Sequence, residues 1–268
     1  MTYVVDKKIT PDAIQTMNYP DFVALMKQDN TPPGGSYTLD YWIEHSNISK
    51  NSLLLDLACS TGYSSRYCYE KLNTLAQGID ISNVAINLAK EKASILGAND
   101  SLTYQVSDAC ELPFKSVYFT HILAGCNFAF IQERETALDE VIRVLKKGGV
   151  ICTSNFYYRR TPESQIINNV YNAIGFKPDP KWDLQYWHDF FNHEKLELLH
   201  EKNYELTSQN YSDLQKNISN YIRKDNEFTR ELDKKIQDAF YERFLSIREP
   251  LNTQRDYQGV TIQLWRKK

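Results

Sequence analysis

Three short polar signals follow three apolar segments in the first half of the chain. The first, Asp56 to Gly62, reads DLACSTG, and its small residues allow a tight turn and the close approach of a ligand to backbone amides. The second is Asp80, a carboxylate that can accept hydrogen bonds from both hydroxyls of a ribose. The third is Asp108, which is suited to accept a hydrogen bond from an adenine amino group. In this order and spacing, the three signals predict a nucleoside-binding crevice.

Two histidines in an aromatic stretch are candidate general bases. His188 and His193 lie in the segment WHDFFNH, and a histidine can accept a proton near neutral pH. A packing or surface role is the alternative for each, since nothing else in the sequence orients their rings. Aromatic side chains of the regions around them could bind a cationic substrate through their ring faces. The candidate substrate residues are Tyr37, Trp42, Tyr157, Tyr186 and Trp187.

The elements that must position these residues alternate regularly between residues 52 and 155. Apolar runs predict strands at 53–57, 76–81, 102–106, 118–124 and 150–155, with helices between several of them. This alternation predicts a parallel sheet with helices on both faces. Further along, the sequence predicts a strand at 204–211, a helix capped at Ser212, a longer helix ended by Pro250 and a last strand at 259–265.

Several segments together carry a family resemblance: 53–62, 78–82, Asp108-Ala109 with 112–114, and RVLKKGG at 143–149. With them the sequence resembles the class I S-adenosylmethionine-dependent methyltransferases, most closely the branch that methylates small molecules. The resemblance covers about residues 30–155 and the last strands. It implies an α/β, Rossmann-like, doubly wound sheet of seven strands in the order 3-2-1-4-5-7-6, with an antiparallel last strand, N-terminal helices and a helical lid insertion. It also implies S-adenosyl-L-methionine as the cofactor.

The resemblance assigns site residues as well. Asp56, Ala58, Ser60 and Gly62 would flank the methionine part of the cofactor, Asp80 and Ile81 the ribose, Asp108 and Ala109 the adenine, and Gly125 and Asn127 the methyl group. Residues 31–38 resemble the loop that many of these enzymes place over the cofactor, and no metal ligand is expected. The family's usual Gly-x-Gly-x-Gly is altered, because Ala58 and Ser60 replace its first two glycines. Alanine there costs little if its φ angle is negative.

The expected organisation is a single methyltransferase domain, 1–268, in four parts. These are an N-terminal helical cover (1–45), a cofactor-binding core (46–155), an aromatic-rich cover segment (156–203), and the last two strands with a helical insert at 212–248 (204–268). Aromatic residues make up 13% of the chain, and those outside the core predict a lid and an acceptor pocket. Within the insert, Phe228, Leu232, Ile236, Phe240 and Phe244 form one apolar stripe, interpreted as an inward helix face.

Composition narrows the classes of partner. A near balance of 31 basic and 34 acidic residues argues against a nucleic-acid partner. The sequence contains no run of about 18 apolar residues, so a membrane span is not expected. Residues 1–12 lack the apolar segment of a signal peptide. The five cysteines form no Cys-x-x-Cys pair and suit a reducing, cytoplasmic compartment. The expected partner is a small-molecule methyl acceptor, and a homodimer is left open.

These observations predict methyl transfer from S-adenosylmethionine to a nitrogen or oxygen of a small molecule, by in-line displacement under an aromatic lid. One alternative is a catalytically impaired, methyltransferase-like binding or scaffold protein, suggested by Ala58 and Ser60. The other is a nicotinamide-dependent oxidoreductase, since Asp80 would serve either nucleotide. Against the oxidoreductase, the first loop lacks Gly-x-Gly-x-x-Gly and Asp108 would have no task.

Overall fold

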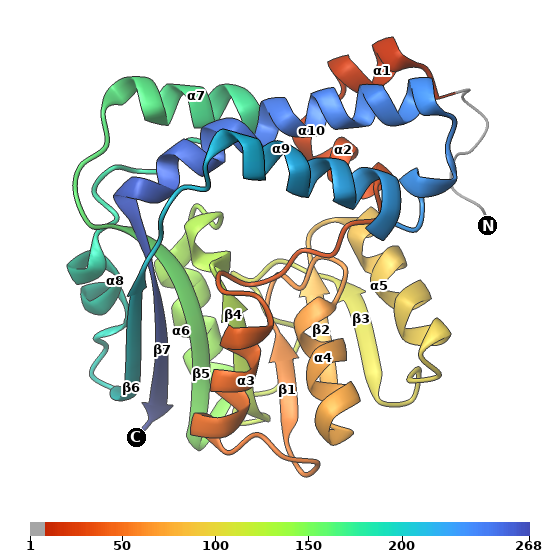
Figure 1. Ribbon diagram of the computed structural model, residues 1–268. Coiled ribbons are helices and arrows are strands. Elements are labelled where there is room, and N and C mark those ends of the chain that lie inside the picture. Colours follow the sequence, from red (N-terminus) through yellow and green to blue (C-terminus); the bar gives the residue numbers. More distant parts are fainter. Residues whose placement is uncertain (1–8) are drawn as a thin grey trace. The chain divides into compact units, whose positions relative to one another are not determined.

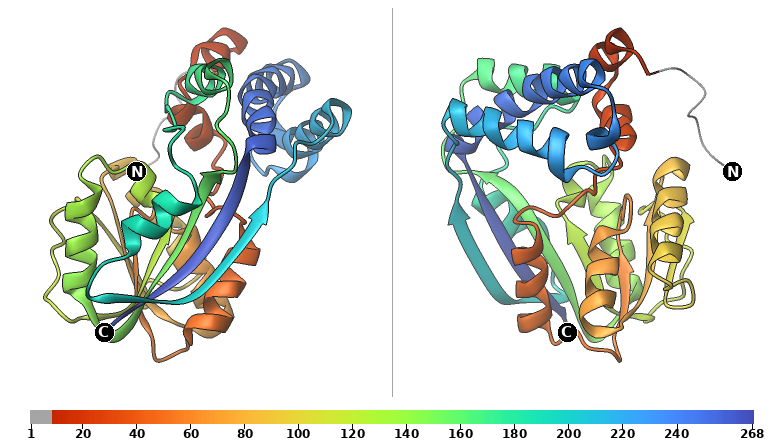
Figure 2. Two further views of the ribbon diagram at one scale, coloured as in Figure 1. Left: turned by 90° about the vertical axis from the view of Figure 1, so that its left-hand side faces the viewer. Right: turned by 45° about the vertical axis from the view of Figure 1, so that its right-hand side comes forward.

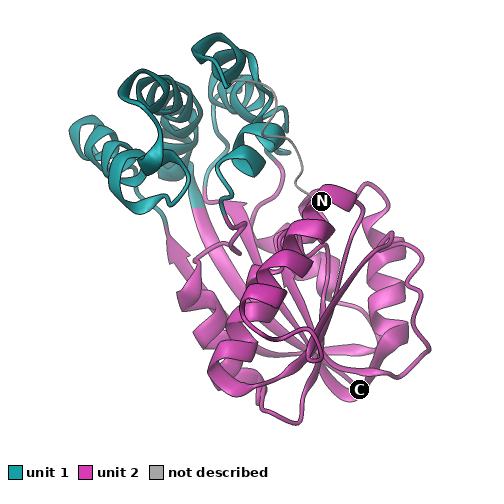
Figure 3. Cartoon of the chain, turned by 90° about the vertical axis from the view of Figure 1, so that its right-hand side faces the viewer, with its two compact units in different colours: residues 1–28, 160–180, 206–258 teal, residues 29–159, 181–205, 259–268 magenta. Residues whose placement is uncertain are grey.

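The computed structural model describes residues 9–268. Residues 1–8, which belong to the expected N-terminal helical cover and to the segment expected to lack a signal peptide, lie outside the described residues. The chain forms two compact units, where a single domain was expected (Figure 3). Unit 1 contains the described residues up to Gln28, with 160–180 and 206–258; unit 2 contains 29–159, 181–205 and 259–268. Each unit is therefore assembled from three separate stretches of sequence.

Unit 2 is built on a seven-stranded sheet in the order β3-β2-β1-β4-β5-β7-β6, which confirms the predicted fold class (Figure 1). The strands β1 to β5 are parallel to one another, and β7 runs antiparallel to β6. Continuous apolar runs such as LLL in β1 are buried, as expected for strands covered on both faces. Strand bounds are β1 Leu53–Asp56, β2 Leu75–Asp80, β3 Leu102–Val106, β4 Phe119–Gly125, β5 Leu145–Tyr158, β6 Leu196–Glu205 and β7 Gln258–Lys267.

Helices cover both faces of this sheet. In Figure 2, α3 and α4 lie on one face, and α6 and α8 lie on the other. Ser82 caps α5 by accepting a hydrogen bond from the Ala85 backbone N–H at 3.2 Å. The helices of unit 2 are α3 Ser36–Ser46, α4 Tyr63–Leu72, α5 Asn83–Ile95, the short η1 Asn127–Ala129, α6 Arg134–Val144 and α8 Leu184–Phe191.

Unit 1 is helical around one apolar core. Phe240 and Phe244 of the predicted stripe are buried in that core, while Phe228, Leu232 and Ile236 pack against it, so the inward-face interpretation is confirmed. Its helices are α1 Pro11–Thr16, α2 Tyr19–Leu25, α7 Ser164–Ile174, α9 Tyr211–Asn220, α10 Lys234–Gln254 and the short η2 Tyr221–Asp225, η3 Thr229–Glu231 and η4 Arg255–Tyr257. In the described part of the chain, no helix is long and apolar enough to cross a membrane.

Three predictions for the last third of the chain are wrong in detail. The strand expected at 204–211 lies at 196–205, because β6 is an edge strand with mostly half-exposed side chains and little apolar signal. The cap of α9 is Asn210 rather than Ser212, since its side chain accepts a hydrogen bond from Asp213 N–H at 2.9 Å. The helix predicted to end at Pro250 continues to Gln254, so the last two strands and the insert do not follow the expected bounds.

Candidate functional site

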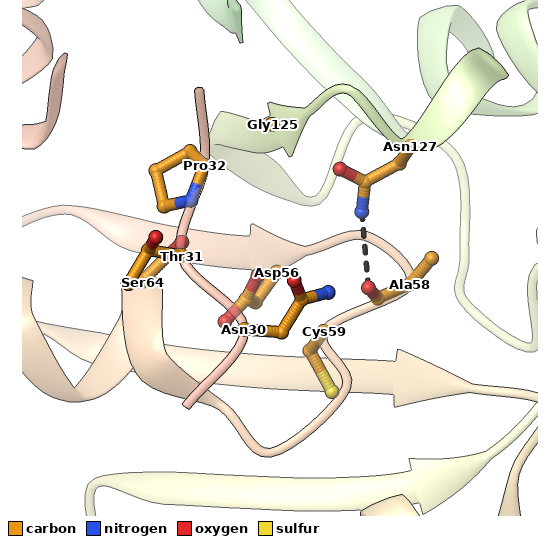
Figure 4. A pocket seen from close by; sticks show the side chains of 9 residues that line it. All are labelled: Asn30, Thr31, Pro32, Asp56, Ala58, Cys59, Ser64, Gly125 and Asn127. Atoms are coloured by element: carbon orange, nitrogen blue, oxygen red, sulfur yellow. Dashed lines mark hydrogen bonds between the residues drawn. The ribbon is translucent and has the colours of Figure 1, made fainter. Parts of the chain in front are cut away.

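A depression of about 280 Å³ opens at the carboxyl ends of β1 and β4 in unit 2 (Figure 4). Three stretches of chain surround it: the loop after β1, the loop after β4, and residues 29–33 before α3, which we call the strap. The lining residues are Asn30, Thr31, Pro32, Asp56, Ala58, Cys59, Ser64, Gly125 and Asn127. Four of these, Asp56, Ala58, Gly125 and Asn127, are among the predicted cofactor residues.

Asp56, the last residue of β1, fixes the loop that follows it. Its side chain is buried, and its Oδ2 accepts hydrogen bonds from the Ser65 backbone N–H at 3.0 Å and from Ser65 Oγ at 2.6 Å. Ser65 lies in the first turn of α4, so these bonds join the strand end to the helix start. Burial raises the pKa of Asp56 to about 7, although the hydrogen bonds from Ser65 oppose the shift.

The loop after β1 takes a left-handed path at three residues. Ala58, Ser60 and Gly62 have φ angles of 46°, 48° and 74°. The expectation that Ala58 costs little required a negative φ, and the structure contradicts that condition: a residue with a Cβ is strained there by about 1–2 kcal/mol. Gly62 is also fixed by packing, because a Cβ on it would lie 2.6 Å from the Tyr104 hydroxyl oxygen. The loop therefore keeps a glycine-like course despite its two substitutions.

Asp80 ends β2 beside the same loop. Its Oδ2 accepts a hydrogen bond from Ser60 N–H at 2.9 Å, and its Oδ1 accepts one from Ser82 N–H at 2.8 Å. Each carboxylate oxygen can accept a second hydrogen bond, which leaves acceptor positions for the hydroxyls of a ligand. The next side chain, Ile81, is 77% exposed. An apolar face therefore stands next to the carboxylate, an arrangement that suits a nucleoside.

Asp108 and Ala109 follow β3 at this same edge of the sheet. The register pairs Asp80 with Val106, so Asp108 lies two residues beyond the end of the paired strands. Asp108 is exposed, and its Oδ1 accepts a hydrogen bond from Cys110 N–H at 2.8 Å. Ala109 is buried. The position of Asp108 is compatible with the predicted adenine contact, which stays a prediction.

The loop after β4 closes the pocket from the other side. A Cβ on Gly125 would lie 2.5 Å from Cβ of Pro32, so glycine is what allows the strap to approach the sheet. Asn127 donates hydrogen bonds from Nδ2 to the carbonyl oxygens of Leu57 and Ala58, the latter at 3.0 Å (Figure 4). The Asn127 amide thus connects the loops on the two sides of the depression.

Several lining residues were not predicted from the sequence. Asn30 lies one residue before the loop that the sequence singled out, 31–38. Cys59 and Ser64 are not among the predicted cofactor residues. The one sequence signal for these two residues is their position: Cys59 lies within the segment DLACSTG, and Ser64 lies two residues after it.

The structure buries three of the aromatic residues predicted to contact a substrate. Trp42 and Trp187 are fully buried, and their Nε1 atoms donate hydrogen bonds to the carbonyl oxygens of Thr153 at 3.2 Å and Phe156 at 2.9 Å. Tyr157 is also buried, with its ring against Gly259. All three side chains thus pack within unit 2, and a contact of any of them with the substrate stays a prediction.

The other two predicted substrate residues are accessible. Tyr186 is half-buried, and its hydroxyl accepts a hydrogen bond from Arg134 at 2.9 Å. Tyr37 in α3 is 51% exposed and meets the Tyr204 ring edge-on at 6.0 Å.

Neither predicted catalytic histidine is among the residues that line the pocket. His193 precedes β6, whose first residue pairs with Lys267 near the end of β7. That end is the amino edge of the parallel strands, because Lys267 Nζ donates a hydrogen bond to the carbonyl oxygen of Leu145, where β5 begins. The ring of His188 packs against Trp265, two residues earlier in β7. These contacts agree with the alternative of packing or surface roles, and a catalytic role for either histidine stays a prediction.

The groups at the carboxyl edge fit S-adenosylmethionine chemically. Ribose hydroxyls and an adenine amino group are donors, and Asp80 and Asp108 both have acceptor positions left over. The small residues Ala58 and Ser60 let the other end of the ligand approach the backbone of the first loop.

Comparisons with known proteins agree with this chemistry. Residues 55–153 match the family described as "Methyltransferase domain". A C-methyltransferase of ubiquinone and menaquinone biosynthesis, UbiE of Idiomarina loihiensis, is 30% identical over 53% of this chain and 56% of its own length. The chain spans 48–64% of the length of the first three curated relatives that it matches.

Solved structures extend the likeness to most of the chain. The crystal structure of a protein named MccD is 55% identical, covers 90% of this chain and 100% of its own, and has a TM-score of 0.79. A phosphoethanolamine N-methyltransferase of Haemonchus contortus, solved with S-adenosylmethionine, shares the fold with a TM-score of 0.69 at 15% identity, over 97% of this chain and 61% of its own. Residues 55–153 are thus a methyltransferase domain, and unit 2 has the fold of the class I S-adenosylmethionine-dependent methyltransferases.

Proposed function

We propose that this chain transfers a methyl group from S-adenosylmethionine to a nitrogen or oxygen atom of a small molecule. The observation that carries the proposal is the depression at the carboxyl ends of β1 and β4, which Ala58 and Asn127 help to line, with Asp80 bound to its first loop. The net charge of −3 supports a small acceptor, because a nucleic-acid substrate would favour a basic surface.

In the proposed reaction the residues around the pocket mainly hold and orient the cofactor and the acceptor. The cofactor supplies a methyl group on a positively charged sulfur. Asp80 and Asp108 would hold the nucleoside, and the loop at Ala58 would hold the methionine end. Gly125 and Asn127 would border the methyl group and leave room for the acceptor. Because methyl transfer is an in-line displacement, such fixed geometry contributes a large part of the acceleration.

The pocket lining favours an acceptor that needs no base. In the lining that the structure describes there is no histidine or lysine, and its one carboxylate, Asp56, is bound by Ser65. A base is required only when the attacking atom still carries a proton. An amine nitrogen with a free lone pair is therefore favoured over a hydroxyl oxygen. Tyr37 and Tyr186 are the accessible candidates for aromatic positioning.

Titration calorimetry with S-adenosylmethionine, S-adenosylhomocysteine and NAD tests the proposal, followed by transfer of labelled methyl groups to a panel of amines and phenols. We expect heat with the first two ligands, none with NAD, and labelling of an amine. Binding without transfer to any member of the panel would favour the scaffold alternative. Heat with NAD alone would favour the oxidoreductase.

We also propose that the protein works in the cytoplasm. All five cysteines are free, and Cys59, Cys68 and Cys152 are buried. Burial raises the pKa of the Cys152 thiol to about 12, which keeps it protonated and unreactive. Free, inert thiols are typical of a reducing compartment.

A further inference from the structure

The strap, residues 29–33, forms one wall of the pocket. Its central residues, Asn30, Thr31 and Pro32, all line the depression. Its far end is anchored to α3, because Thr38 Oγ1 donates a hydrogen bond to the carbonyl oxygen of Pro33 at 2.5 Å. A segment that crosses a pocket and is anchored at one end needs a second anchor if it is to stay closed.

The second anchor is Asp29, the first residue of the strap. Its Oδ1 accepts three hydrogen bonds, from Arg66 Nη2 at 2.7 Å, Lys92 Nζ at 2.6 Å and Thr61 Oγ1 at 2.9 Å. The donors come from α4, α5 and the loop after β1, so a single carboxylate oxygen joins the strap to three different elements of unit 2. Charge-assisted bonds of this length are the stronger kind.

This cluster is sheltered enough for the charges to matter. The side chains of Arg66, Lys92 and Asp29 are 14%, 20% and 29% exposed. Ion pairs screened from water in this way contribute more than exposed surface pairs do. Two cations share one carboxylate, so the loss of the Asp29 charge would leave two positive groups side by side next to the first residue of the strap.

We propose that Asp29 is a positioning residue that latches the strap over the cofactor, with Arg66 and Lys92 as the groups it binds. The inference rests on the proposed function, since it assumes that S-adenosylmethionine occupies this pocket. Asp29 does not touch the reacting atoms. It controls how long the cofactor stays bound, because the strap must move before the ligand can leave.

The dissociation rate of the cofactor tests the latch. Protein loaded with tritiated S-adenosylmethionine is chased with excess S-adenosylhomocysteine, and the retained label is followed in time. We expect Asp29→Asn to raise the dissociation rate by about tenfold or more, since each factor of ten corresponds to the loss of one good interaction. Asp29→Glu, which keeps the charge, should recover part of the loss.

A matched control separates the latch from a general loss of charge. Asp40 in α3 is exposed and lies 3.8 Å from Lys71. Asp40→Asn should leave the dissociation rate within about twofold of the wild type, as surface changes usually do. Lys92→Gln removes one positive charge from the Asp29 cluster by a substitution outside the strap, and it should also raise the rate. Combined with Asp29→Asn, it should add less than its own separate effect, because both changes break the same bond.

The outcomes distinguish this inference from the proposed function. If Asp29→Asn and Lys92→Gln both fold, with melting curves of wild-type shape, and release label at the wild-type rate, the latch is wrong while the cofactor site stands. If Asp29→Asn does not fold, Lys92→Gln alone decides, and an unchanged rate overturns the inference. A wild-type chain that retains no label contradicts the proposed function, and the latch falls with it.

Discussion

Ala58 and Ser60 show what a sequence can and cannot tell about single residues. The spacing of Asp56, Asp80 and Asp108 predicts that they share one edge of the sheet, and the structure places them there. The positive φ angles of Ala58 and Ser60 could not be predicted, because they depend on contacts from elsewhere, such as the bond of Ser60 N–H to Asp80. The same holds for the burial of Trp42, which depends on what packs over it.

Replacing Ala58 by glycine should stabilise the protein. Glycine removes the strain of a Cβ at φ 46° but makes the unfolded chain more flexible, so we expect a net gain of about 0.5–1 kcal/mol in the free energy of unfolding. Urea denaturation measures the change. Gly97→Ala is the matched opposite change, because it adds a Cβ at a φ angle of 69° where no neighbouring atom is in the way. It should lower the free energy of unfolding by about 1 kcal/mol. A destabilised Ala58→Gly would contradict the loop conformation described for unit 2.

Asp56 should make stability depend on pH. Its pKa is about 7 in the folded protein, against 3.8 for an ordinary exposed aspartate. The folded protein therefore keeps a proton that the unfolded chain loses, and the free energy of unfolding should fall as pH rises from about 4 to 7, by up to roughly 4 kcal/mol. Asp56→Asn stays neutral and can still accept from Ser65, so it should remove this part of the slope. Urea unfolding across that pH range measures it, and an unchanged slope in the variant would refute the assignment.

At the scale of elements, the parallel core could be predicted and the periphery could not. The apolar runs of β1, β4 and β5 are long enough to identify, whereas β6 is an edge strand whose pattern is weak. Because the sequence predicts this strand at 204–211 instead of 196–205, it does not show that His193 directly precedes β6. The first residue of β6 pairs with Lys267, at the amino edge of the parallel strands. An aromatic stretch such as 186–191 predicts burial or ligand contact equally well, and the structure shows burial for Trp187 and Phe191.

Pro250 offers a test within one helix. It lies inside α10, four residues before the last, Gln254, where it removes a backbone hydrogen bond and crowds the preceding turn. Pro250→Ala should raise the free energy of unfolding by about 2 kcal/mol, after allowance for the greater flexibility of the unfolded chain. Thermal unfolding followed by circular dichroism would show it. A lower melting temperature would mean that the helix does not continue through this residue.

At the scale of the molecule, the two units are interleaved in sequence. The last ten residues, 259–268, belong to unit 2 and form most of β7, which lies between β5 and β6 in the sheet. We expect their deletion to prevent unit 2 from folding, because it removes an inner strand and exposes the edges of its neighbours. Loss of cooperative unfolding and of cofactor binding would be observed. A truncated chain that binds S-adenosylmethionine as tightly as the full chain would contradict this architecture.

The central claim is that the carboxyl edge of β1, β2 and β4 binds S-adenosylmethionine through Asp80. Titration calorimetry of the wild type, Asp80→Ala and the exposed control Asp100→Ala with S-adenosylmethionine tests it most directly. We predict one site in the wild type, an affinity lower by about tenfold or more in Asp80→Ala, and no comparable change in Asp100→Ala. Equal affinity in the wild type and Asp80→Ala, or no binding by the wild type, would contradict the claim.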